Sequence, residues 1–144
     1  MRILGLDIGE RRIGVAISDE TGIIARGLET IDRKDDIIAA GEISDIIKQY
    51  NADSVVYGMP FAQDGTIGEQ GEKTLSFISK LNESQNIEFI QWDERFSTRE
   101  ATRMLITGNV KRKKRKSLKD KVAAVIILQG YLDSRSFRAM RDTE

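Results

Sequence analysis

Three acidic residues stand out in this sequence by their placement. Asp7 lies inside an apolar run, Glu94 directly follows another, and Asp120 lies just before the apolar stretch near the C-terminus. A carboxylate in a buried strand is costly unless a cation, a metal or several donors stabilise it. The chain contains neither His nor Cys, and hard oxygen ligands alone select Mg²⁺ or Mn²⁺. We therefore expect Asp7, Glu94 and Asp120 to hold Mg²⁺ (or Mn²⁺) as catalytic residues of a phosphate-handling site.

Carboxylate-held metal ions can hydrolyse a phosphodiester bond without histidine. Mg²⁺ uses one or two carboxylates and keeps its other positions for water and substrate phosphate. Two such ions about 4 Å apart can activate a water and stabilise the leaving oxygen. The residue types thus favour a metal-dependent endonuclease, and the number of ions stays open.

Each acid also has a structural interpretation. Asp7 could cap the following turn through hydrogen bonds to the backbone. Glu94 could form an ion pair with a neighbouring arginine on an exposed surface. Asp120 could complete a capping box that begins at Ser117. We interpret Asp93 as structural.

A concentrated basic segment precedes the last apolar stretch. Residues 109–121 hold eight Lys and Arg against one Asp, so this window carries +7 and the other residues −7 in a chain of zero formal charge. Such a patch on an acidic body favours capture of a polyanion, although a basic run can also be a solvated loop. The expected nucleic-acid-binding residues of this segment are Lys111, Arg112, Lys113, Lys114, Arg115, Lys116 and Lys119.

The hydrophobic pattern predicts the elements that position these side chains. Residues 3–8 and 13–17, on either side of Gly-Glu-Arg-Arg, predict a β-hairpin. Further strands are expected over residues 23–30, 54–57 and 87–92, and helices over 35–50, 69–82, 97–108 and from 117 onwards. This order predicts an α/β fold: a mixed five-stranded sheet, three antiparallel strands and then αβ crossovers, flanked by helices. Ligands of such sheets bind at the carboxyl ends of strands, where Asp7 and Glu94 fall.

Length and composition limit the class of protein. A chain of 144 residues predicts one domain over 1–144, with a frayed tail after about residue 134. Without Cys there is no disulfide framework. No apolar run reaches the roughly 18–20 residues of a membrane span, and the first residues show no signal-peptide pattern. We expect a cytoplasmic protein with no membrane partner.

Four motifs resemble those of the YqgF/RuvX family, in the same order and spacing along nearly the whole chain. They are GLDIGERRIGVA at 5–16, VVYGMP at 55–60, DERFST at 93–98 and KDKVAAVIILQGYL at 119–132. The resemblance implies an RNase H-like fold. It also implies a nuclease that either matures the 5′ end of the small-subunit ribosomal RNA precursor or resolves Holliday junctions. The family's three acids fall on Asp7, Glu94 and Asp120.

Two details of the resemblance concern the site. Arg12 matches the Arg of the family's RIGVA and could contact a phosphate, or form a salt bridge to Asp7 or Asp19. Resolvases of this superfamily take a second acid from the fourth strand, which here ends at residues 57–60 with no carboxylate. Glu94, from the neighbouring strand, would then have to reach the same metal.

The function expected is therefore cleavage of structured RNA or branched DNA by a nuclease. One alternative is a non-catalytic nucleic-acid or ribosome-associated factor with the same fold and basic patch. A remote one is an actin-like or sugar-kinase-like phosphate binder, because Asp7-x-Gly9 before a hairpin also resembles those proteins' first phosphate motif. The sequence does not decide whether the substrate is DNA or RNA. It also does not decide whether the protein is a monomer or a homodimer; the two-fold symmetry of a dimer would suit paired cuts in a junction.

Overall fold

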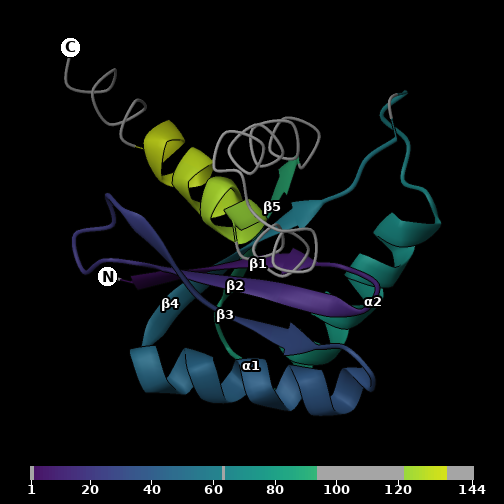
Figure 1. Ribbon diagram of the computed structural model, residues 1–144, viewed down its shortest axis with the longest axis horizontal. Helices are drawn as coiled ribbons and strands as arrows, with labels where there is room; N and C mark the ends of the chain where they lie inside the picture. Colours follow the sequence, from purple (N-terminus) through teal and green to yellow (C-terminus); the bar gives the residue numbers. More distant parts are fainter. Residues whose placement is uncertain (1, 63, 94–121, 136–144) are drawn as a thin grey trace, which may run out of the picture.

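The computed structural model describes residues 2–62, 64–93 and 122–135. Five strands form one sheet in the order β3-β2-β1-β4-β5. The strands are β1 Arg2–Ile8, β2 Arg12–Ser18, β3 Ala25–Asp32, β4 Ala52–Met59 and β5 Glu88–Asp93, and the helices are α1 Asp36–Tyr50, α2 Glu69–Glu83 and a helix over residues 122–135 (Figure 1). None of these described helices has the length and apolar character to cross a bilayer.

The sheet is mixed, as predicted. Strand β1 pairs antiparallel with β2, which pairs antiparallel with β3, and β1 pairs parallel with β4, which pairs parallel with β5. The predicted hairpin is confirmed, and α1 and α2 are the crossovers that return the chain to the same end of the sheet. The carboxyl ends of the parallel strands β1, β4 and β5 therefore lie at the same end of the sheet.

The two faces of the sheet bury separate cores, because strand side chains alternate between faces. Leu4 and Leu6 of β1 pack with α1 and α2 on one face. Ile3 packs with Leu128 on the other, beneath the helix over residues 122–135. Figure 1 shows this helix, in yellow, on the opposite side of the sheet from α1. Since Asp7 shares the alternation of Ile3, its side chain stands on the face of the yellow helix.

That helix lies very close to the sheet at Gly5. A Cβ atom at Gly5 would lie 2.7 Å from Leu128 Cβ and 3.2 Å from the Ala124 carbonyl oxygen. Both distances are shorter than ordinary van der Waals contact, so a side chain here must displace the helix or the strand. Gly5 is therefore required by packing.

The helix runs antiparallel to β1. In the middle of this stretch, Gln129 Oε1 accepts from the Ala25 N–H at 2.9 Å, and Gln129 Nε2 donates to the Ile23 carbonyl at 2.8 Å. Ala25 pairs with Ser18, whose hydroxyl accepts from the Ile3 N–H near the start of β1. The helix residues before Gln129, such as Ala124 beside Gly5, therefore lie further along β1, toward the end where Asp7 lies.

Two predicted strand boundaries are wrong. Strand β4 does not end at Tyr57, because Gly58 and Met59 continue the ladder with β5. Strand β3 begins two residues later than residue 23, because the Asp19 carboxylate binds the N–H groups of Ile23 and Ile24 and holds them in a turn. The helix predicted over residues 97–108 and the start of the last helix lie outside the described residues.

Candidate active site

Asp7 occupies a buried position between two glycines. It is 8 % exposed and pairs in register with Gly14 of β2. On its other side Leu6 pairs with Tyr57, so the β4 residue level with Asp7 is Gly58. Neither strand beside Asp7 therefore places a side chain next to its carboxylate on this face. Asp7 thus lies near the carboxyl end of β1 with glycine on both sides of it in the sheet.

The neighbouring parallel strands provide no acid level with Asp7. Strand β4 has Gly58 there, which agrees with the absence of a fourth-strand carboxylate noted in the sequence, and Trp92 of β5 pairs with Gly58. Strand β5 ends at Asp93, two inter-strand spacings of about 4.8 Å each from β1. Glu94 comes next in the chain.

Glu94 and Asp120 both lie outside the described residues. Of the three acids predicted to hold the metal, the structure thus describes Asp7. Within residues 2–62, 64–93 and 122–135, no three Asp or Glu side chains come together as a metal-binding cluster. The predicted basic run also lies outside the described residues; it consists of Lys111, Arg112, Lys113, Lys114, Arg115, Lys116 and Lys119.

Arg12 begins β2 on the same face as Asp7. It lies two residues before Gly14, the register partner of Asp7, and side chains two apart along a strand share a face. No ion pair between described residues involves Arg12. Arg12 is half-buried, and its place in the register puts it beside Asp7 on this face.

The salt bridge considered between Arg12 and Asp19 is not formed, because Asp19 serves its own turn. Its carboxylate accepts from the Thr21 hydroxyl at 2.5 Å and from the N–H groups of Ile23 and Ile24 at 2.9 and 3.1 Å. These hydrogen bonds, that of Thr21 first, lower the pKa of Asp19 to about 2. Asp19 is a turn residue, at the other end of β2 from the register partner of Asp7.

The turn over residues 9–12 connects the strand of Asp7 to Arg12. It is stabilised by a hydrogen bond between its own residues and by hydrogen bonds from Arg33. The Gly9 N–H donates to the Arg12 carbonyl at 2.9 Å, and a Cβ at Gly9 would lie only 2.8 Å from that oxygen. From outside, the Arg33 N–H donates to the Arg11 carbonyl at 2.7 Å and Arg33 Nη1 to the Gly9 carbonyl at 2.9 Å.

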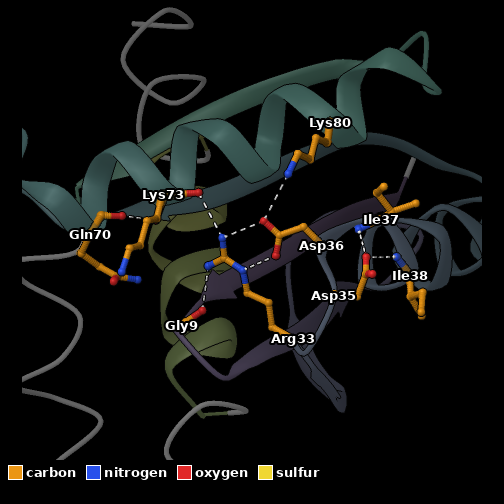
Figure 2. Close-up of polar contacts among 10 residues, drawn as sticks. Gly9, Arg33, Asp35, Asp36, Ile37, Ile38, Gln70, Lys73 and Lys80 are labelled. Atoms are coloured by element: carbon orange, nitrogen blue, oxygen red, sulfur yellow. Dashed lines mark hydrogen bonds and ion pairs between the residues drawn. The ribbon is translucent and has the colours of Figure 1, made fainter.

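Arg33 was not predicted from the sequence, although it is the most extensively bonded described side chain near the site (Figure 2). Its side chain is 6 % exposed, and Nε and Nη2 bind the two Asp36 carboxylate oxygens at 2.9 and 3.3 Å. Nη2 also donates to the Lys73 carbonyl at 3.2 Å, and the guanidinium lies 5.2 Å from the Phe77 ring centroid. The sequence signal that could have indicated this ion pair is the spacing of Arg33 and Asp36, three residues apart at the start of a predicted helix.

The ion pair predicts how stability depends on pH. Mainly through the Arg33 hydrogen bond, the pKa of Asp36 lies below its ordinary 3.8 in the folded state. The ionised form therefore stabilises the fold above that pH, and this contribution is lost as pH falls through the lower folded pKa. We expect Asp36→Asn to lower the free energy of unfolding by about 1.5–3 kcal/mol at pH 7. In urea titrations the difference from wild type should shrink below pH 3.8; a difference that grows there would contradict this account.

Comparisons with known proteins agree with this architecture. A family described as "RuvX: Holliday junction resolvase" matches residues 1–134. The chain is 52 % identical over 137 residues to the "Putative pre-16S rRNA nuclease" of Bacillus cytotoxicus, covering 94 % of this chain and all of that protein. It is 50 % identical to the protein of the same name from Bacillus cereus, with the same coverage.

Two solved structures share the fold. The Fowlpox virus resolvase bound to Holliday junction DNA superposes with a TM-score of 0.61 at 16 % identity, covering 93 % of this chain and 98 % of that one. Thermus thermophilus RuvC in complex with a Holliday junction substrate gives 0.57 at 15 % identity, covering 94 % and 96 %. These likenesses establish an RNase H-like sheet with helices on both faces.

Proposed function

Because the chain belongs to the RuvX family, we propose that it is a metal-dependent endonuclease acting on structured nucleic acid in the cytoplasm. The observation that carries the proposal is the position of Asp7, buried between two glycines at the carboxyl end of β1. The name of the Bacillus relatives favours the precursor of small-subunit ribosomal RNA as substrate. The fold shared with junction-binding resolvases makes branched DNA the second choice.

We propose that Asp7, Glu94 and Asp120 hold Mg²⁺ or Mn²⁺. Asp7 offers a hard carboxylate, the ligand type that Mg²⁺ prefers, flanked by glycine in both neighbouring strands. Glu94 is next in the sequence to Asp93, the last residue of β5 at this end of the sheet, and Asp120 comes shortly before the helix over residues 122–135. When bound, Mg²⁺ polarises the phosphoryl oxygen and lowers the pKa of bound water.

The basic residues bind the substrate backbone in this proposal. Arg12 stands on the face of Asp7 and neutralises a phosphate beside the scissile bond. The run from Lys111 to Lys116, with Lys119, contacts phosphates further along. Such contacts position a nucleic acid without reading its sequence, so specificity follows the shape of the substrate.

A cleavage assay on a precursor RNA stem and a branched DNA junction tests the proposal, each with Mg²⁺ or with EDTA. We expect cleavage of the RNA in Mg²⁺ and none in EDTA. Paired cuts in the junction by a species that sediments as a dimer would instead identify a resolvase. Binding of both substrates without cleavage would contradict the proposal and identify a non-catalytic factor.

The salt dependence of binding tests the basic run separately. Each phosphate neutralised adds roughly 0.7–0.9 to the slope of log affinity against log salt. Replacing Lys113, Lys114 and Arg115 together with Ala should reduce that slope by about 2. The control is Lys48→Ala, on the exposed side of α1, which should leave the slope unchanged. An unaltered slope in the triple variant would show that the basic run does not neutralise phosphates of the bound nucleic acid.

A further inference from the structure

We propose that Arg33 is a positioning residue for the nuclease site, and this inference rests on the proposed function. Arg33 fixes the turn over residues 9–12, which begins two residues after Asp7 and ends at Arg12, the first residue of β2. In this role it sets the separation and orientation of the carboxylate and the guanidinium that would meet the scissile phosphate.

The contacts of Arg33 join three parts of the fold. Its Nη1 reaches the Gly9 carbonyl in the turn, its Nε and one Nη2 contact reach Asp36 in α1, and Nη2 also reaches the Lys73 carbonyl in α2 (Figure 2). With the guanidinium over the Phe77 ring as well, the side chain has little freedom to move. The turn is thereby tied to both helices that cover the other face of the sheet.

Lys73 adds a second link between the turn and α2. Its carbonyl accepts from Arg33, and its ammonium lies 3.5 Å from Glu10 Oε1 in the turn. The Glu10 pair is exposed and contributes little by itself. The buried guanidinium of Arg33 is therefore the stronger of these two side-chain links.

The geometry requires arginine at this position. Four separate donor contacts point in fixed directions, two to one carboxylate and two to backbone carbonyls in different elements. A planar guanidinium presents donors in such a fork, whereas lysine offers one ammonium that cannot span all of these acceptors. Arg33→Lys keeps the charge beside Asp36 and loses the bridge to the turn.

Arg33→Lys, with Lys80→Ala as the matched control, tests the proposal. Lys80 Nζ lies 3.6 Å from the same Asp36 carboxylate, and among the described residues it forms no ion pair with the turn. The readouts are amide hydrogen exchange of Gly9, kcat and KM for the precursor RNA stem, and thermal unfolding. Kinetics are measured well below the unfolding transition of each variant.

We expect Arg33→Lys to speed exchange of the Gly9 amide and to lower kcat by about 10²-fold, the cost of a misplacement of about 1 Å. Lys80→Ala should keep both within about threefold of wild type. Equal effects of the two variants, or a protected Gly9 amide in Arg33→Lys, would overturn the proposal. Should the wild type cleave no substrate, the proposed function fails, while the exchange measurement still decides whether Arg33 holds the turn.

Gly9→Ala gives a second, independent variant should Arg33→Lys fail to fold. The added methyl clashes with the Arg12 carbonyl inside the turn and touches none of the α1 or α2 contacts of Arg33. It should reproduce the loss of kcat with a smaller loss of thermal stability than Arg33→Lys. Normal kcat in Gly9→Ala would show that the position of the turn is irrelevant to cleavage.

Discussion

Asp7→Asn is expected to lower kcat for the precursor RNA by at least about 10³-fold, equivalent to about 4 kcal/mol of transition-state stabilisation. Asparagine keeps the size of the side chain and removes the negative charge that a hard divalent cation requires. The measurement is single-turnover cleavage in Mg²⁺, with thermal unfolding recorded on the same samples. A folded Asp7→Asn variant without cleavage is the expected result.

Asp53→Asn is the matched control for this prediction. Asp53 lies on β4 near its start, at the opposite end of the sheet, where its carboxylate accepts from the Arg2 N–H at 3.2 Å. It should cleave at the wild-type rate. If Asp7→Asn cleaves at the wild-type rate, Asp7 is not a catalytic residue. Its role would then be structural, as an aspartate that caps the turn.

A second large effect is expected from Gly5→Ala. The new Cβ would lie 2.7 Å from Leu128 Cβ and so must push the helix over residues 122–135 off the sheet. Such overpacking lowers the free energy of unfolding by about 1–3 kcal/mol. Because Asp120 comes shortly before this helix in the sequence, we also expect a loss of kcat, about 10²-fold for a shift of about 1 Å.

The control adds the same methyl group where there is space. Gly41 lies in α1 with no atom within 4 Å of an added Cβ. Gly41→Ala should raise the free energy of unfolding by up to about 1 kcal/mol, as expected for replacing glycine inside a helix, with unchanged kcat. A stable, fully active Gly5→Ala would show that the helix has room to move or does not matter for cleavage.

Local patterns predicted the order and type of the elements, because apolar alternation and helical periodicity are visible in the sequence. Boundaries that depend on distant partners could not be predicted in this way. Gly58 and Met59 look like a strand stop in the sequence, yet pairing with β5 keeps them in the sheet. Ile23 is a different case: it looks like the start of a strand, yet the carboxylate of nearby Asp19 accepts its N–H, a local contact that the apolar pattern does not show.

The candidate site also separates local signals from distant contacts. The buried position of Asp7 was predictable, since an acidic residue inside an apolar run is visible in the local sequence. Arg33 was not, because its acceptors on Gly9 and Lys73 lie 24 and 40 residues away in the chain. The catalytic and metal-binding roles of Asp7, Glu94 and Asp120, the nucleic-acid contacts of the basic residues, and the single domain over residues 1–144 stay predictions.

Mn²⁺ binding followed by electron paramagnetic resonance tests the central claim most directly, because it needs no substrate. Wild type, Asp7→Asn, Glu94→Gln and Asp120→Asn would be titrated under identical conditions, with Asp53→Asn as the reference. We predict one tight class of Mn²⁺ site in the wild type and the reference, weakened in each of the three other variants. Unchanged Mn²⁺ affinity in Asp7→Asn would contradict a metal centre built on this strand.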